Sequence, residues 1–125
     1  MGKKILVIDD EELIIRSLAK LLEKNEFDVY IAKTGNDALI MVEEEVFDLV
    51  ISDIRMPGLN GIEAVKGIYE VLRGKNSKEP PVIFITGYAD KDCEEEAKAL
   101  KPIDYLYKPF DINVLMDRIR EEISE

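Results

Sequence analysis

The chain has 125 residues, of which 46% are hydrophobic, and this length fits one domain that can bury its own core. Its 27 acidic and 17 basic side chains leave a net charge of −10, which repels phosphate backbones and argues against direct nucleic-acid binding. The absence of histidine and the single cysteine, Cys93, exclude histidine-ligated metal sites, Ser-His-Asp triads and internal disulfides, and a lone thiol fits a cytoplasmic location.

Five short apolar runs are spaced along the chain. They lie at residues 5–8, 29–32, 49–51, 82–85 and 105–107. Continuous apolar runs of this length are typical of strands that are buried on both faces of a parallel sheet. None of them approaches the length of a membrane-spanning segment, so we expect no contact with a membrane.

Amphipathic stretches follow these runs and predict helices. In the first, one face is expected to carry Leu13, Ile14, Leu18, Leu21 and Leu22, and Asn25 is a candidate end. A second helix is expected to begin near residues 34–36. The third carries an apolar stripe that steps by 3, 4 and 3 residues, formed by Ile62, Val65, Tyr69 and Leu72.

Two further helices complete the pattern. Asp90 is a candidate N-cap for a helix that runs through Ala97 towards Leu100, and Asp111 is a candidate N-cap for the last, with Ile112 on its inner stripe. A strand followed by a helix, five times over, predicts an α/β fold: a (βα)5 doubly wound, five-stranded parallel sheet with helices on both faces. We expect one domain over residues 1–125, with an ordered core of about residues 3–123.

Polar side chains stand where four of the five predicted strands end. The first strand ends at Asp9 and Asp10, the third at Asp53, the fourth at Thr86 and the fifth at Lys108. Taken singly, the aspartates could be helix caps, the threonine a turn former and the lysine a loop residue. Ligand sites of open parallel sheets lie at the carboxyl ends of the strands, so the agreement of four strand ends favours one shared site.

The chemistry of that site follows from charge. Clustered carboxylates repel one another and take up protons unless a cation neutralises them. Mg²⁺ prefers oxygen ligands and also accepts phosphate oxygens. A carboxylate beside Mg²⁺ and a lysine can attack a phosphoryl group, because both cations screen the incoming negative charge. The predicted product is an acyl phosphate on an aspartate. The threonine hydroxyl would donate a hydrogen bond to one phosphoryl oxygen, and the lysine would form an ion pair with another.

Four segments, at residues 5–11, 48–61, 82–87 and 105–110, follow a known pattern in order and spacing. Through them the chain resembles the receiver domain of two-component response regulators, from about Lys3 to Ile123. The sequence of residues 51–58 and 84–88 is most similar to that of receivers of nitrogen-regulatory-type activators. The resemblance implies a flavodoxin-like receiver fold, like that of chemotaxis regulators, and a phosphorylation-controlled signalling function.

The resemblance also implies a metal site. Asp53 is the implied phosphoacceptor and shares in Mg²⁺ binding, with Mn²⁺ as an acceptable substitute. Asp10 is implied as a direct ligand and Asp9 as a carboxylate that acts largely through water. Arg55 matches the position whose main-chain carbonyl completes the coordination by the protein.

The remaining implied roles concern catalysis and switching. Lys108 matches the lysine that pairs with the phosphoryl group, and its peptide bond to Pro109 is cis in the family. Thr86 matches a residue that both assists phosphoryl transfer and moves towards the phosphate, and Tyr105 is its implied switch partner. Separately, Tyr88 is bulky and, with Arg55, could flank the phosphoryl group and shield it from water.

The implied partners are a sensor histidine kinase or phosphotransfer protein, and a downstream effector domain or protein. The effector would bind the face built by the fourth helix, the fifth strand and the fifth helix, and a homodimer through that face is a further possibility. The chain ends just past the last expected helix, so no effector domain is expected in it. We expect no turnover of an external substrate.

Two other readings stay open. A phosphorylation-independent docking or dimerisation module could have the same fold, although such modules usually lose acidic or lysine positions that this chain keeps. A phosphatase with an aspartyl-phosphate intermediate generally has a second aspartate two positions after its nucleophile. Arg55 stands at that place here, which argues against the phosphatase.

Overall fold

The computed structural model describes residues 2–123, and the remaining residues of the expected domain, Met1, Ser124 and Glu125, lie outside the described part. Strands and helices alternate in the order β1 (Lys4–Ile8), α1 (Glu12–Lys24), β2 (Asp28–Ala32), α2 (Gly35–Glu44), β3 (Leu49–Asp53), α3 (Gly61–Gly74), β4 (Val82–Thr86), α4 (Lys91–Ala99), β5 (Asp104–Tyr107) and α5 (Ile112–Ile123). The predicted (βα)5 fold class is therefore confirmed.

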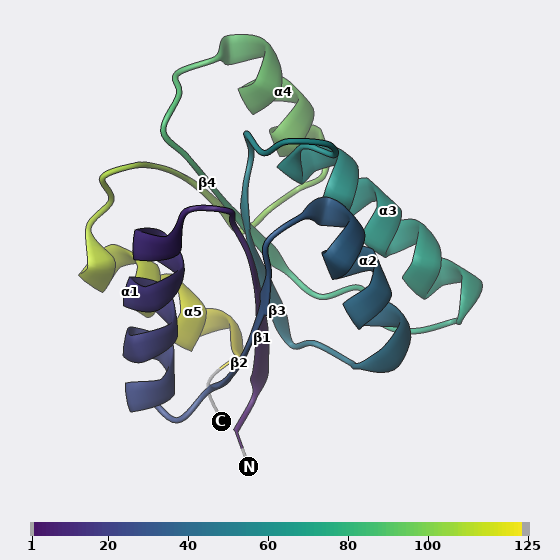
Figure 1. Cartoon of the computed structure of the whole chain (residues 1–125), viewed down its shortest axis with the longest axis horizontal. Coiled ribbons are helices and arrows are strands. Elements are labelled where there is room, and N and C mark those ends of the chain that lie inside the picture. The colour runs from purple at the N-terminus through teal and green to yellow at the C-terminus, as the bar shows by residue number, and fades with distance from the viewer. Residues whose placement is uncertain (1, 124–125) are drawn as a thin grey trace.

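All five strands join one parallel sheet in the order β2-β1-β3-β4-β5. Figure 1 shows α1 and α5 on one face of this sheet and α2, α3 and α4 on the other. Strand order reverses at β1, because the chain runs outward from β1 to β2 and then returns to β3 on the other side. The carboxyl ends of β1 and β3 thus lie at a topological switch point, where open sheets place their ligand sites.

Two apolar cores lie between the sheet and its helices. On one face, alternate strand residues such as Leu6, Val50 and Phe84 pack against α2 and α3. On the other face, Ile5, Ile51 and similar residues pack against α1 and α5. The central strands β3 and β4 are buried along their whole length, which explains their continuous apolar sequence.

Helix boundaries follow local capping chemistry. The side chain of Thr34 caps α2, and Asn60 forms a reciprocal capping box with Glu63 at the start of α3. Asp90 caps α4 as predicted, by accepting a hydrogen bond from the Cys93 N–H at 3.1 Å. Asp111 precedes α5 and accepts a hydrogen bond from the Asn113 N–H at 2.8 Å.

The predicted burial of two residues, Leu13 and Ile112, is wrong. Leu13 of α1 is 78% exposed, and the buried residues of that helix are Ile15, Leu18 and Leu22, which define a stripe that Leu13 does not share. Ile112 is 40% exposed because it stands at the first position of α5, beyond the edge of the core. Within residues 2–123, no helix combines the length and apolar character that crossing a membrane requires.

Candidate functional site

Three aspartates meet at the carboxyl edge of the sheet. Asp9 and Asp10 follow β1, and Asp53 is the last residue of β3. Each offers a carboxylate oxygen, and these oxygens lie within 4.8 Å of one another. Asp9 is fully buried and Asp53 is 4% exposed, whereas Asp10 is exposed and opens the cluster to solvent.

Hydrogen bonds at the end of β3 hold Asp53 in place. Its carboxylate accepts a hydrogen bond from the Ile54 N–H at 2.8 Å, and its carbonyl accepts one from the buried Ser52 hydroxyl at 2.9 Å. Gly61, the first residue of α3, donates its N–H to the Ile54 carbonyl at 2.7 Å. A Cβ at Gly61 would lie 1.8 Å from the Asp53 carbonyl oxygen, so this close approach requires glycine.

Lys108 reaches the cluster from the end of β5. Its Nζ lies 3.3 Å from carboxylate oxygens of both Asp9 and Asp53, and 2.6 Å from Glu11. Its N–H donates to the Thr86 carbonyl at 2.7 Å, and its peptide bond to Pro109 is cis. The sequence interpretation missed Glu11, although its place directly after Asp10 puts a further carboxylate beside the cluster.

The cluster carries negative charge that its own lysine does not balance. Burial, reinforced by the charge of Asp9, raises the pKa of Asp53 to about 6 despite the opposing effect of Lys108. Burial also raises the pKa of Asp9. Burial alone would lower the pKa of Lys108, but its hydrogen bond to Glu11 and the charges of Asp53 and Asp9 outweigh this, so that its pKa lies above the usual value.

These residues fit a hard divalent cation. Three carboxylates with converging oxygens and one solvent-open side match the oxygen ligands and retained waters that Mg²⁺ prefers. A dication there would counter both causes of the raised pKa of Asp53, which are burial and the charge of Asp9. Asp9, Asp10 and Asp53 are therefore the side chains that can hold it.

Thr86 and Tyr105 lie on the neighbouring strands β4 and β5. Thr86 is buried at the end of β4, and its hydroxyl oxygen accepts a hydrogen bond from the Tyr88 N–H at 3.2 Å. The ring of Tyr105 lies 6.4 Å from that of Phe84, between centroids. Its hydroxyl is buried without a hydrogen-bond partner among the described residues, and burial raises the pKa of Tyr105 to about 12.

Arg55 and Tyr88 stack on each other and together line an open hollow. The Arg55 guanidinium carbon lies 4.4 Å from the centre of the Tyr88 ring. The hollow has a volume of about 510 Å³ and is lined by Asp10, Glu11, Asp53, Arg55, Gly87, Tyr88 and Lys108. Arg55 and Tyr88 thus share one opening with Asp53.

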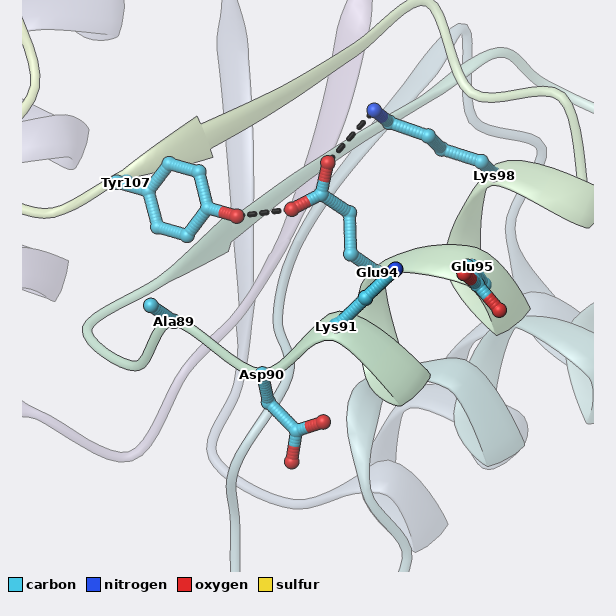
Figure 2. Close-up of a pocket in the computed structure, with 7 residues that line it drawn as sticks. All are labelled: Ala89, Asp90, Lys91, Glu94, Glu95, Lys98 and Tyr107. Carbon is cyan, nitrogen blue, oxygen red and sulfur yellow. Dashed lines mark hydrogen bonds and ion pairs between the residues drawn. The ribbon is translucent and has the colours of Figure 1, made fainter.

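A second pocket lies between α4 and β5, next to this site. In Figure 2, Tyr107 points from β5 towards Glu94 of α4, to which its hydroxyl donates a hydrogen bond. Lys98 lies 2.6 Å from the other carboxylate oxygen of Glu94. The Asp90 carboxylate points away from this group. The first half of α4 is thus held by two carboxylates that face different neighbours.

The parallel sheet with an acidic cluster and a lysine at its carboxyl edge defines a class of phosphoryl-accepting signalling domains. The family model described as "Response regulator receiver domain" matches residues 5–120, and the chain belongs to this family. Receiver domains are signalling modules, and they bind Mg²⁺ at an acidic pocket such as this one.

Solved structures of similar proteins agree. A CheY-like receiver domain protein from Methanospirillum hungatei JF-1 is 29% identical, with a TM-score of 0.86 over 97% of this chain and 93% of that one. The chemotaxis protein CheY4 of Vibrio cholerae is 28% identical, with a TM-score of 0.84 over 98% and 100%. The receiver domain of the Francisella response regulator 1452 is 31% identical, with a TM-score of 0.80 over 96% and 95%.

Proposed function

We propose that this receiver accepts a phosphoryl group on Asp53 from a sensor histidine kinase or phosphotransfer protein. The observation that carries the proposal is the position of the Asp53 carboxylate, within reach of both the Asp9–Asp10 pair and the Lys108 ammonium. A bond forms between a carboxylate oxygen of Asp53 and phosphorus, and the bond from phosphorus to the donor's imidazole nitrogen breaks. The imidazole leaves with the electron pair of that bond.

Each neighbouring group has a part in this step. Asp9, Asp10, Asp53 and the Arg55 main-chain carbonyl would hold Mg²⁺. The ion would supply positive charge that offsets the negative charge of the phosphoryl group. Lys108 pairs with one phosphoryl oxygen, and the Thr86 hydroxyl donates to another. Mn²⁺ is proposed as a substitute because it accepts the same oxygen ligands.

The proposed response passes through Thr86 and Tyr105. In reaching the phosphoryl group, Thr86 gives up its contact with the Tyr88 N–H, which ties it to the loop after β4. Tyr105 lies on β5 against Phe84 and can respond to that loop. The face of α4, β5 and α5 then changes its affinity for an effector domain or protein, or for a second copy of the chain. We propose that residues 1–125 form one receiver domain that acts in the cytoplasm, without turnover of external substrates.

Incubation with acetyl phosphate and Mg²⁺ tests the acceptor. Intact mass should show one added phosphoryl group that requires Mg²⁺ and is absent from Asp53→Asn. Asp117→Asn, which removes an exposed carboxylate of α5, is the matched control and should be labelled like the parent. An unlabelled parent that also fails to bind beryllofluoride would favour the alternative, a phosphorylation-independent docking module.

A further inference from the structure

Arg55 is held close to Asp53 by two side chains that the receiver chemistry above does not use. Its Nη2 lies 3.3 Å from Oδ2 of Asp90, and its guanidinium stacks on the ring of Tyr88. Both partners belong to the segment between β4 and α4, whereas Arg55 follows β3. The three side chains therefore link the loop that follows Asp53, here called the acceptor loop, to the start of α4.

Asp90 uses its two carboxylate oxygens for different purposes. Oδ1 accepts the hydrogen bond from the Cys93 N–H that caps α4, and Oδ2 faces Arg55. The hydrogen bond from Cys93, with a smaller effect of Arg55, holds the pKa of Asp90 below its usual value, so this carboxylate is charged at neutral pH. Asp90 can release Arg55 and still cap the helix, because the two contacts are independent.

A phosphoryl group on Asp53 would change this balance of charge. Arg55 and Lys108 are the cations among the described residues that line the hollow, and Lys108 already serves Asp9, Asp53 and Glu11. A phosphoryl group carries up to two negative charges and three acceptor oxygens, against one charge on Asp90. A guanidinium also matches phosphoryl geometry through parallel hydrogen bonds.

We propose that the Arg55 guanidinium exchanges Asp90 for the phosphoryl group when Asp53 is phosphorylated, so that Arg55 becomes a second phosphoryl-binding cation and α4 loses its link to the acceptor loop. The Tyr88 ring keeps the guanidinium over the hollow in both states, because stacking does not require Asp90. This inference rests on the proposed function, since it needs a phosphoryl group at Asp53.

The exchange predicts a competition that a double-mutant cycle can measure. The probe is beryllofluoride with Mg²⁺, a stand-in for the phosphoryl group, and its affinity is measured by calorimetric titration. Asp90→Asn keeps an oxygen that caps α4 but removes the competing charge, so it should tighten binding about 2- to 5-fold. Arg55→Gln should weaken binding about 5- to 10-fold.

The double variant decides whether the two effects share one cause. In the Arg55→Gln background, Asp90→Asn should leave the affinity unchanged, because no guanidinium remains to be released. Arg73→Gln is the matched control, because Arg73 also pairs with a carboxylate, Glu79, and lies near a tyrosine ring, but away from the hollow. It should bind the probe like the parent.

The other outcomes overturn the inference. An Asp90→Asn variant that binds no more tightly than the parent, or that gains the same factor without Arg55, contradicts the exchange. A parent that binds beryllofluoride normally while Arg55→Gln binds equally well also contradicts it, and leaves the proposed phosphoacceptor intact. A parent that neither binds beryllofluoride nor takes up a phosphoryl group overturns both.

Discussion

Helices α3 and α4 lie on the same face of the sheet, but different interactions hold them (Figure 1). Helix α3 buries seven of its residues, and α4 buries Ala97 among its described residues. In place of an apolar face, α4 has polar links, from Asp90 to Arg55 and from Glu94 to Tyr107 (Figure 2).

The difference matches what each helix adjoins. Gly61 at the start of α3 packs against the carbonyl of Asp53, so a rigid α3 keeps Asp53 in a fixed place. Burial of one large aliphatic side chain stabilises a fold by about 1.5–3 kcal/mol, whereas an exposed ion pair contributes about 0–1 kcal/mol. A helix held mainly by exposed polar contacts can therefore shift with only a small change in free energy.

The largest difference between the two helices should appear when one inward-facing side chain of each is truncated and the loss of stability is measured. Ile68 of α3 is fully buried, so Ile68→Ala should lower the free energy of unfolding by about 2–5 kcal/mol, through lost burial and a cavity. Cys93 of α4 is half-buried, and Cys93→Ala should lower it by less than about 1 kcal/mol. Urea denaturation of both variants, with the parent as reference, measures these values.

Equal losses in the two variants would contradict the assignment of α4 as the weakly packed helix. Far-ultraviolet circular dichroism controls for a changed native fold. An unaltered slope of the unfolding free energy against urea shows that the same surface is exposed on unfolding in each case.

The ionisation of Asp53 supplies a smaller, pH-dependent effect. The pKa of Asp53 is raised from 3.8 to about 6 on folding, so its ionisation in the folded state is unfavourable. The folded protein therefore loses stability, relative to Asp53→Asn, as pH rises from about 4 through 6. Above that range, without Mg²⁺, the variant should be more stable by about 1–3 kcal/mol.

Urea unfolding between pH 4 and pH 8, in a chelating buffer, measures this difference. The two proteins should converge near pH 4, where Asp53 is protonated in the folded state. Added Mg²⁺ should narrow the gap at pH 7.5, because the cation binds the charged site of the folded parent. A gap that stays constant across the pH range would show that ionisation of Asp53 is not its cause.

Much of this arrangement is readable from sequence because it rests on short-range signals. The buried strands are unbroken apolar runs, and Asp90 and Thr34 stand where capping chemistry begins a helix. The stripe of α3 is predicted correctly because all of its members are buried. The meeting of Asp9, Asp10, Asp53 and Lys108 follows from topology, since parallel strands place their carboxyl ends at one edge.

Contacts between loops are different, because side-chain direction decides them. The sequence predicted that Arg55 and Tyr88 lie near Asp53, but the ion pair of Arg55 with Asp90 depends on how the loop after β4 turns. Glu11 likewise reaches Lys108, 97 positions away, only once the fold is formed. The predicted burial of Leu13 is wrong because an apolar residue in the first turn of a helix can extend past the core.

The link from Glu94 to Tyr107 should give the smallest global effect and the most local one. Tyr107→Phe removes the hydroxyl that donates to Glu94 and keeps the ring that packs at 5.5 Å on Tyr105, between centroids. Because Tyr107 is 42% exposed, the free energy of unfolding should fall by less than about 1 kcal/mol. Amide hydrogen exchange in α4 should nevertheless quicken about 2- to 5-fold, with α3 unchanged, because local opening depends on local contacts.

Tyr30→Phe is the matched control for this substitution, since the Tyr30 ring packs edge-on against Phe47, away from α4. It should leave exchange in both helices as in the parent. If Tyr107→Phe quickened α3 and α4 alike, the two helices would open as one unit. The polar links of α4 would then belong to the same cooperative core as the apolar face of α3, and a shift of α4 alone would be as unfavourable as disruption of that core.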